Sequence, residues 1–413
     1  MTPDDAAEAS RRVSAFERSG DPGDLWPGLG EPARVAAARE LERIARGLLA
    51  GGAPLEIDDR FGAYALGVAG HTTGMGPVVG RWIEDGRVRA RPDVAAVFAR
   101  HLDHGRRRAA RIECEALPAI DALIARKIPL IALKGFHTSR VFFDEPGMRR
   151  ISDVDVLVPA SRIADAEAGL ASVGFEPTGP TERPYKRNWM GSGVDPRFYS
   201  VELADARTSW ALELHASLDR PFNASASARL DAFRHRVQPL VVAGRALHAL
   251  ESTLLFVYLA CHTSQELENM RLLRVFELVQ VIRRARPDWN GVRSLIDRSN
   301  AAAFVYPALS LVHDLAPGSI PAELLAASRR ASTWAARHAV PRLAPAGGSV
   351  DERGILSQLM WTRGPAAIMQ RAFRALWPAS ITRPDQVVPG WRARLRRLKA
   401  GLVTLRAPDE RAD

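Results

Sequence analysis

The stretch that decides the fold spans residues 149–158 and reads Arg-Arg-Ile-Ser-Asp-Val-Asp-Val-Leu-Val. Side chains on a β-strand point alternately to its two faces, so Asp153 and Asp155 share one face while the valines that alternate with them share the other. Two carboxylates aimed at one point repel each other unless a cation lies between them, and their oxygens suit Mg²⁺ or Mn²⁺. The pattern therefore predicts a strand with a divalent-cation site, and a solvated strand end with two aspartates is the alternative.

A second feature lies upstream, where a strand expected over residues 128–133 leads through Lys134-Gly135 into a short helix expected over residues 136–143. A junction of strand, glycine and helix gathers backbone N–H groups and the positive end of a helix, which together attract phosphate. Lys134 is one of only four lysines in the chain. We expect it to bind phosphate there, with a surface lysine extended into solvent as the alternative.

Two arginines, Arg149 and Arg150, directly precede the strand with the aspartates. A guanidinium group donates paired hydrogen bonds to phosphate oxygens, so both residues could contact a triphosphate. They could equally balance the charge of the nearby acids.

A third carboxylate is expected downstream, where residues 210–215 read Trp-Ala-Leu-Glu-Leu-His. The alternation places Glu213 and His215 on one strand face and the apolar side chains on the other. Glu213 would complete a two-metal site that activates an acceptor hydroxyl, holds a triphosphate and releases pyrophosphate after in-line displacement. Glu213 is also a candidate general base. Glu202 is its rival for the ligand position, and an exposed hairpin charge is the alternative without chemistry.

Four motifs together resemble a known family, the uncharacterised bacterial nucleotidyltransferases of the DNA polymerase beta superfold. They are Leu133-Lys134-Gly135, Pro146-Gly147-Met148-Arg149, Asp153-Val154-Asp155-Val156-Leu157-Val158 and Leu212-Glu213-Leu214-His215. Three later segments resemble the helical half of that family, namely 254–262, 272–278 and 287–290. The resemblance covers about residues 60 to 320.

The resemblance implies that Asp153 and Asp155 bind metal, that Glu213 is the third acidic ligand and that an NTP is the donor. The Gly-Ser or Gly-Gly turn usual in the superfamily is Gly135-Phe136 here, so Lys134 and Arg149 would have to substitute in triphosphate binding. The candidate nucleotide-binding set is therefore Lys134, Gly135, Arg149, Arg150 and Ser152.

The expected fold class is α+β, with a small mixed-sheet nucleotidyltransferase core flanked by helical regions. We expect an N-terminal helical region over 1–115, the core over 116–220, a C-terminal helical domain over 221–340 and a basic amphipathic helical tail over 350–413. Helices are expected over 32–49, 60–85, 92–127, 161–173, 247–264, 266–286, 289–299, 301–315 and 321–338, from apolar spacing and from flanking Gly, Pro and Asp residues.

Composition sets the broad class. The chain has 413 residues, 46% of them hydrophobic, and a net charge of +10 that comes from 53 arginines and four lysines against 47 acids. Such a charge permits a nucleic-acid partner, but the bias of arginine over lysine points to overall composition, so nucleic acid is an unlikely partner. The acidic N-terminus, the absence of a long apolar stretch and two widely spaced cysteines favour a cytoplasmic location without a membrane span.

Two histidines are candidates for an acceptor pocket, His215 on the strand and His262 in an apolar helical stretch, where a core histidine is the commoner reading. His71 has weaker support. Near the C-terminus, leucines at helical spacing alternate with arginines from residue 391 to residue 405. Such a helix could touch an anionic membrane peripherally, although docking on its own protein is the favoured interpretation.

From these features we predict a metal-dependent nucleotidyltransferase that uses Mg²⁺ or Mn²⁺ and moves an NMP from an NTP to an acceptor hydroxyl on a small molecule, sugar, peptide or protein. The alternative is a non-catalytic protein that binds a nucleotide or phosphate on the same fold.

Overall fold

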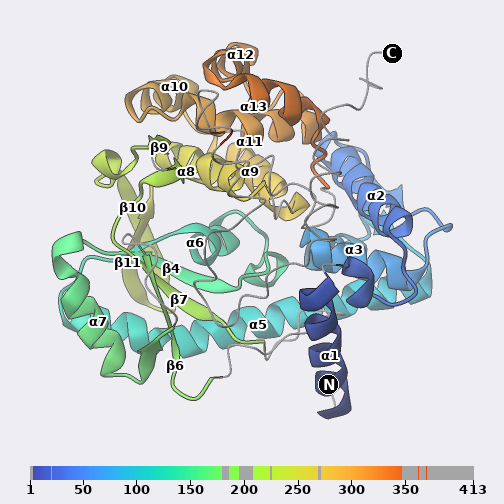
Figure 1. Ribbon diagram of the computed structural model, residues 1–413, viewed down its shortest axis with the longest axis horizontal. Coiled ribbons are helices and arrows are strands. Elements are labelled where there is room, and N and C mark those ends of the chain that lie inside the picture. Colours follow the sequence, from blue (N-terminus) through green and yellow to red (C-terminus); the bar gives the residue numbers. More distant parts are fainter. Residues whose placement is uncertain are drawn as a thin grey trace.

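A seven-stranded mixed sheet forms the centre of the molecule (Figure 1). The computed structural model describes residues 3–19, 21–178, 186–194, 208–223, 226–267, 271–346, 361 and 369. The strand order is β10-β11-β3-β4-β7-β6-β5. These strands span Ile131–Ala132 (β3), Asp153–Leu157 (β4), Phe175–Pro177 (β5), Lys186–Gly191 (β6), Ala211–His215 (β7), Val237–Val242 (β10) and Arg245–Leu250 (β11).

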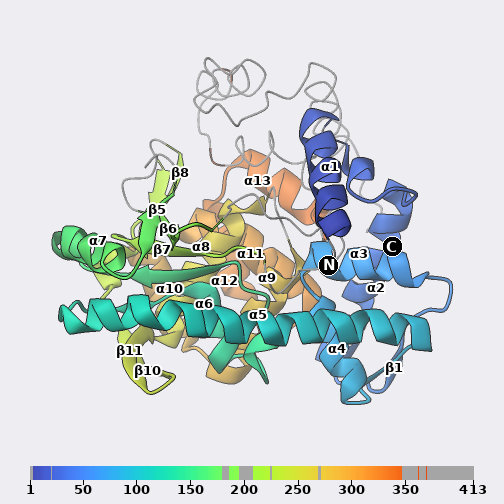
Figure 2. The same cartoon turned by 90° about the horizontal axis from the view of Figure 1, so that it is seen from below.

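Strand β4 lies in the middle of the sheet, antiparallel to β3 and parallel to β7. Its apolar face, with Val154 and Val156, packs in one hydrophobic cluster with Leu212 and Leu214 of β7 and with side chains of α5 (Pro92–Ala125) and α7 (Ile163–Ala171). Helix α5 runs along one whole side of the molecule (Figure 2). Since side chains alternate, burial of this face directs the polar side chains of β4 and β7 to the opposite face.

Helices of the C-terminal half gather beyond that opposite face (Figure 1). They span Ser252–Gln265 (α8), Leu272–Ala285 (α9), Trp289–Arg298 (α10), Ala302–Leu315 (α11), Ala322–Ala331 (α12) and Trp334–Ala339 (α13). Leu157 of β4 belongs to the same large hydrophobic cluster as α8, α9 and α11. This cluster joins the helical half to the sheet beside the polar side chains.

The N-terminal part supplies further helices and a short parallel strand pair. The helices are Pro3–Ser19 (α1), Glu31–Leu49 (α2), Ala63–Thr73 (α3) and Gly76–Glu84 (α4), and the strands are Leu55–Glu56 (β1) and Val88–Arg89 (β2). Helix α6 (Lys134–Val141) follows β3, and a second small strand pair consists of β8 (Arg220–Asn223) and β9 (Ala226–Ala228).

The expected fold class, α+β with a mixed-sheet core and flanking helices, is confirmed, but some element boundaries were wrong. The helix expected from residue 247 begins only at Ser252, because residues 237–250 form the hairpin of β10 and β11. Its turn holds Ala243 and Gly244, both at positive φ, which fits a two-residue hairpin turn. The sheet thus includes residues beyond 220, where the C-terminal helical domain was expected to begin. The helix expected over 321–338 is two helices, because the Thr333 side chain caps a new one.

Two expectations fall on residues outside the described ranges: Glu202 as the rival of Glu213 for the ligand position, and the basic helix over 391–405. Among the helices that are described, none combines the length and the apolar character needed to cross a membrane.

Candidate active site

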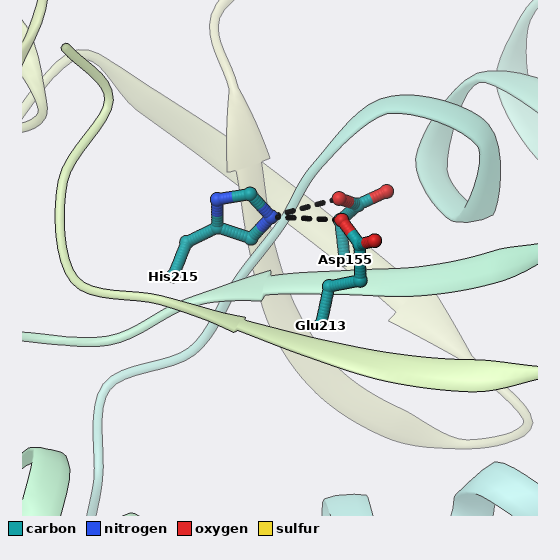
Figure 3. Close-up of side chains that lie close together, drawn as sticks. All are labelled: Asp155, Glu213 and His215. Atoms are coloured by element: carbon teal, nitrogen blue, oxygen red, sulfur yellow. Dashed lines mark hydrogen bonds and ion pairs between the residues drawn. The ribbon is translucent and has the colours of Figure 1, made fainter. Parts of the chain in front are cut away.

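Three polar side chains from β4 and β7 lie together on the face of the sheet opposite α5 (Figure 3). The parallel register pairs Asp155 with Glu213, and His215 follows two positions later on the same face. One ligand atom of each residue lies within 4.8 Å of the others. Asp155, Glu213 and His215 have only 0%, 7% and 1% of their surface exposed. Strand pairing therefore creates a buried cluster of two carboxylates and an imidazole.

Two lysines neutralise this cluster. Lys134 places its Nζ 2.6 Å from Asp155 Oδ1 and 3.6 Å from Glu213 Oε2, and the Nζ of Lys186 on β6 donates to Glu213 Oε1. The backbone of Lys134 is left-handed, with φ 40°, a conformation that is uncommon for a side-chain-bearing residue and that costs roughly 1 kcal/mol or more. The strained backbone lies where the lysine meets the carboxylates, as expected at a functional site.

The imidazole of His215 holds Asp155 in place. Its Nε2 lies 2.8 Å from Asp155 Oδ1 and 3.5 Å from Glu213 Oε2. Burial alone would raise the pKa of Asp155, but Lys134 and His215 outweigh it and hold that pKa well below its usual range. The structure therefore places His215 inside the carboxylate cluster, whereas the sequence suggested an acceptor pocket.

Asp153 lies on the same strand face as Asp155, two positions earlier, and is partly buried. It is not part of the 4.8 Å group. Burial and the charge of Asp155 raise the pKa of Asp153 to about 6, against the opposing effect of Lys134. Proton loss from this carboxyl group is therefore opposed until a further cation approaches.

The residues of this face fit a divalent cation. Asp155 Oδ2 and Glu213 Oε2 are buried and accept no hydrogen bond from any described residue. Buried carboxylate oxygens without donors are unfavourable unless a positive group compensates them, and they are ligands of the kind that Mg²⁺ and Mn²⁺ prefer.

Arg149, which the sequence analysis assigned to triphosphate binding, forms an ion pair with Glu277. Its Nε and Nη2 donate to Glu277 of α9 at 2.6 and 3.0 Å, and the Thr138 hydroxyl donates to the same carboxylate. Gly135 makes this approach feasible, because a Cβ at that position would lie 2.2 Å from Arg149 Nη1. Arg149 and Gly135 thus form a link between the sheet and the C-terminal helices. No role was predicted for Glu277. The feature of the sequence that could have pointed to it is a single acidic residue among the apolar residues of a helix.

The remaining candidates lie around the cluster. The exposed Ser152 donates to Asp153 Oδ1 at 3.3 Å, and Arg150 donates to His71 Nδ1 at 3.2 Å, away from the aspartates.

His262 on α8 lies 3.3 Å from Arg274 Nη1, while its buried Nδ1 has no hydrogen-bond partner among the described residues. Burial and the charge of Lys134 hold the pKa of His262 well below its usual range. Lys186, which donates to Glu213, was not among the predicted site residues, although it is one of the four lysines of the chain.

Comparison with known proteins gives one strong match. A model of the protein family described as uncharacterised nucleotidyltransferase matches residues 69–317. No curated protein sequence matches the chain. The antibiotic-resistance factor ANT(2'')-Ia is 14% identical in sequence with a TM-score of 0.33, and the match covers 47% of this chain and 95% of that chain. An antigenic nucleotidyltransferase-like protein from Paracoccidioides brasiliensis is 12% identical with a TM-score of 0.29, covering 47% of this chain and 92% of that chain.

Proposed function

Since the chain belongs to the uncharacterised nucleotidyltransferase family, we propose that it moves an NMP from an NTP to an acceptor hydroxyl and releases pyrophosphate. The observation that supports this most is the buried cluster of Asp155, Glu213 and His215 beside Lys134. Attack of the hydroxyl oxygen on the α-phosphorus forms one P–O bond and breaks another, and the hydroxyl proton must leave to a base.

Asp153, Asp155 and Glu213 would hold the divalent cation, with Mg²⁺ or Mn²⁺ as the proposed metal. When bound, the metal supplies a positive charge that stabilises the pentacoordinate phosphorus and the leaving pyrophosphate. His215 keeps Asp155 oriented through its 2.8 Å hydrogen bond. The Oε2 atom of Glu213 accepts no hydrogen bond from the described residues and so has lone pairs available, and Glu213 would also accept the proton of the acceptor hydroxyl.

Lys134 and Lys186 would bind the triphosphate. The ammonium group of Lys134 contacts Asp155 and that of Lys186 contacts Glu213, on the sheet face that carries the aspartates. Lys134 and Lys186 would turn from the carboxylates to phosphate oxygens once a bound metal compensates the carboxylates. Gly135 near the start of α6 and the exposed Ser152 would complete the set of residues that bind the triphosphate. Arg149 contributes its charge while it remains paired with Glu277.

The acceptor would enter from the C-terminal helices, where His262 of α8 lies close enough to Lys134 to be affected by its charge. We propose His262 as a residue of the acceptor pocket. The acceptor class stays open among small molecules, sugars, peptides and proteins.

The test is pyrophosphate release with each NTP in the presence of Mg²⁺ or Mn²⁺. We expect release by the wild-type chain and loss of at least about a thousandfold for Asp153→Asn combined with Asp155→Asn, because the carboxylates that hold the metal are gone. Asp103→Asn, which removes an exposed carboxylate on α5, is the matched control and should keep full activity. Activity that survives in the double variant would refute the proposal.

A second candidate function is nucleotide or phosphate binding without turnover. It is favoured by the two lysines that already compensate the carboxylates and by Phe136 after Gly135, where the superfamily has a small residue. Metal-dependent NTP binding without pyrophosphate release under any acceptor condition would support this function instead.

A further inference from the structure

Strand β6 brings one more polar side chain, that of Asn188, to the sheet face that carries the carboxylates. The antiparallel register of β6 and β7 pairs Asn188 with Glu213. On the other side of β7, the parallel register pairs Glu213 with Asp155 of β4. Neighbouring strands of a sheet lie about 5 Å apart. Asp155, Glu213 and Asn188 therefore form a row across three adjacent strands, with Glu213 in the middle.

Two neighbours on β6 establish the direction in which the Asn188 side chain points. The ammonium group of Lys186, two residues earlier, donates to Glu213 Oε1 and so lies on the face of the carboxylates. Trp189, the next residue, belongs to the hydrophobic cluster on the opposite face of the sheet. Because side chains alternate along a strand, the Asn188 amide shares the face of Lys186 and Glu213.

Each member of this row carries a buried oxygen atom without a hydrogen-bond donor. Within the described residues, Asn188 Oδ1, Glu213 Oε2 and Asp155 Oδ2 are all buried and accept no hydrogen bond. The two lysines do not change this, because Lys134 contacts the other oxygen of Asp155 and Lys186 the other oxygen of Glu213. Buried acceptors without donors are unfavourable, so the row needs a positive group that contacts all three oxygens.

A divalent cation meets this need better than a hydroxyl group does. A hydroxyl group has one hydrogen to donate and can satisfy one acceptor, so two oxygens of the row would remain without a partner. A cation such as Mg²⁺ takes about six oxygen ligands at once, and the side-chain carbonyl of asparagine is one of the ligand types that divalent cations accept. The composition of the row, two carboxylates and one neutral carbonyl, therefore fits a metal ion.

We propose that the amide oxygen of Asn188 is a ligand of the divalent cation, together with Asp155 and Glu213. The inference rests on the proposed function only for the presence of a metal ion beside these carboxylates. It extends the metal-binding set from β4 and β7 to β6. Since the amide is neutral, Asn188 adds an oxygen ligand without adding to the repulsion between the carboxylates.

The test is a calorimetric titration of Mn²⁺ into the full chain without nucleotide. We expect Asn188→Ala to raise the Kd for Mn²⁺ by at least about 10-fold, since the loss of a group that only supports a metal ligand already costs about 10- to 100-fold in metal affinity. Asn188→Asp keeps a side-chain oxygen and should bind Mn²⁺ at least as tightly as the wild type. Asn290→Ala, at an exposed position near the start of α10, is the matched control and should leave the Kd unchanged.

A second variant separates metal binding from folding. Asn188→Leu has nearly the volume of the wild-type side chain but offers no oxygen. Without metal it should unfold at a temperature no lower than that of the wild type, because a buried acceptor without a donor has been removed. It should nevertheless lose affinity for Mn²⁺ as Asn188→Ala does.

Two results would overturn the proposal. One is an unchanged Kd for Mn²⁺ in both Asn188→Ala and Asn188→Leu, and a raised KM for the NTP in these variants would then assign Asn188 to the nucleotide. The other is a wild-type chain that binds no Mn²⁺, with or without a non-hydrolysable ATP analogue. Because the titration needs no turnover, Mn²⁺ binding that depends on Asn188 in a chain that releases no pyrophosphate would support this inference and count against nucleotidyl transfer.

Discussion

The ion pair between Arg149 and Glu277 should be costly to break, because both side chains are buried. Glu277 accepts from Arg149 Nε at 2.6 Å, from Nη2 at 3.0 Å and from Thr138, and the two side chains are only 14% and 5% exposed. Removing one partner of a buried pair leaves an uncompensated charge and costs about 3–5 kcal/mol. Glu277→Gln keeps one acceptor oxygen, so we expect it to lower the free energy of unfolding by about 3 kcal/mol, the lower end of this range.

The matched control has the same geometry at the surface. Arg245 donates to Asp121 Oδ1 and Oδ2 at 3.0 and 2.8 Å, but these side chains are 34% and 48% exposed. Water and counterions already compensate such charges, and exposed pairs contribute about 0–1 kcal/mol. Asp121→Asn should therefore lower the free energy of unfolding by less than about 1 kcal/mol.

The assay is urea denaturation followed by tryptophan fluorescence, with the three chains compared at one pH and salt concentration. Adding Arg149→Met to Glu277→Gln removes the orphaned charge, so the double variant should recover part of the loss. Two results would refute the reasoning about burial. One is an equal loss in the free energy of unfolding for Glu277→Gln and Asp121→Asn. The other is a double variant that loses about 3 kcal/mol more than Glu277→Gln alone.

Three more outcomes can be measured. Because the pKa of Asp153 is about 6 in the folded chain, above the usual 3.8, the folded state binds more protons between these values and loses stability as pH rises through them. Without metal, the free energy of unfolding of Asp153→Asn should therefore exceed that of the wild type at pH 8 by up to roughly 3 kcal/mol and should match it below pH 4, as thermal melts at the two pH values would show; a gain at pH 3 would contradict this. Mn²⁺ at a hundred times its Kd should stabilise the wild type by about 2.7 kcal/mol in thermal melts, and no such rise should occur in the Asp153→Asn, Asp155→Asn variant. Gly135→Ala should cost about 1–3 kcal/mol, because the new Cβ would lie 2.2 Å from Arg149 Nη1, and unchanged stability would show that this arginine can move freely.

Local pattern was sufficient for the acidic face of the sheet. Alternation in β4 and β7 predicts which side chains share a face, and burial of the valines and leucines on the other side makes the assignment unambiguous. The pairing of Asp155 with Glu213 needs, in addition, the parallel register of two strands more than fifty residues apart, which alternation alone does not specify.

The missed hairpin of β10 and β11 shows where local pattern is weak. Residues 246–249 alternate between exposed and buried side chains, but the strand runs almost directly into the apolar helix α8, so helical and strand periods overlap at the junction. The pairing of His248 with Ile131 of β3 favours the strand, because it gives hydrogen-bond partners to backbone groups of β3 that would otherwise lack them.

The sequence by itself determined the fold class, the strand that carries the aspartates and the face on which Glu213 lies, since these depend on the spacing of neighbouring side chains. Only the tertiary structure decided which side chains the cations meet: Lys134 and Lys186 contact the carboxylates, Arg149 contacts Glu277, and Arg150 contacts His71. Charge pairs form through space between segments far apart in the chain, and Coulomb attraction has no period along the sequence that a reader could detect.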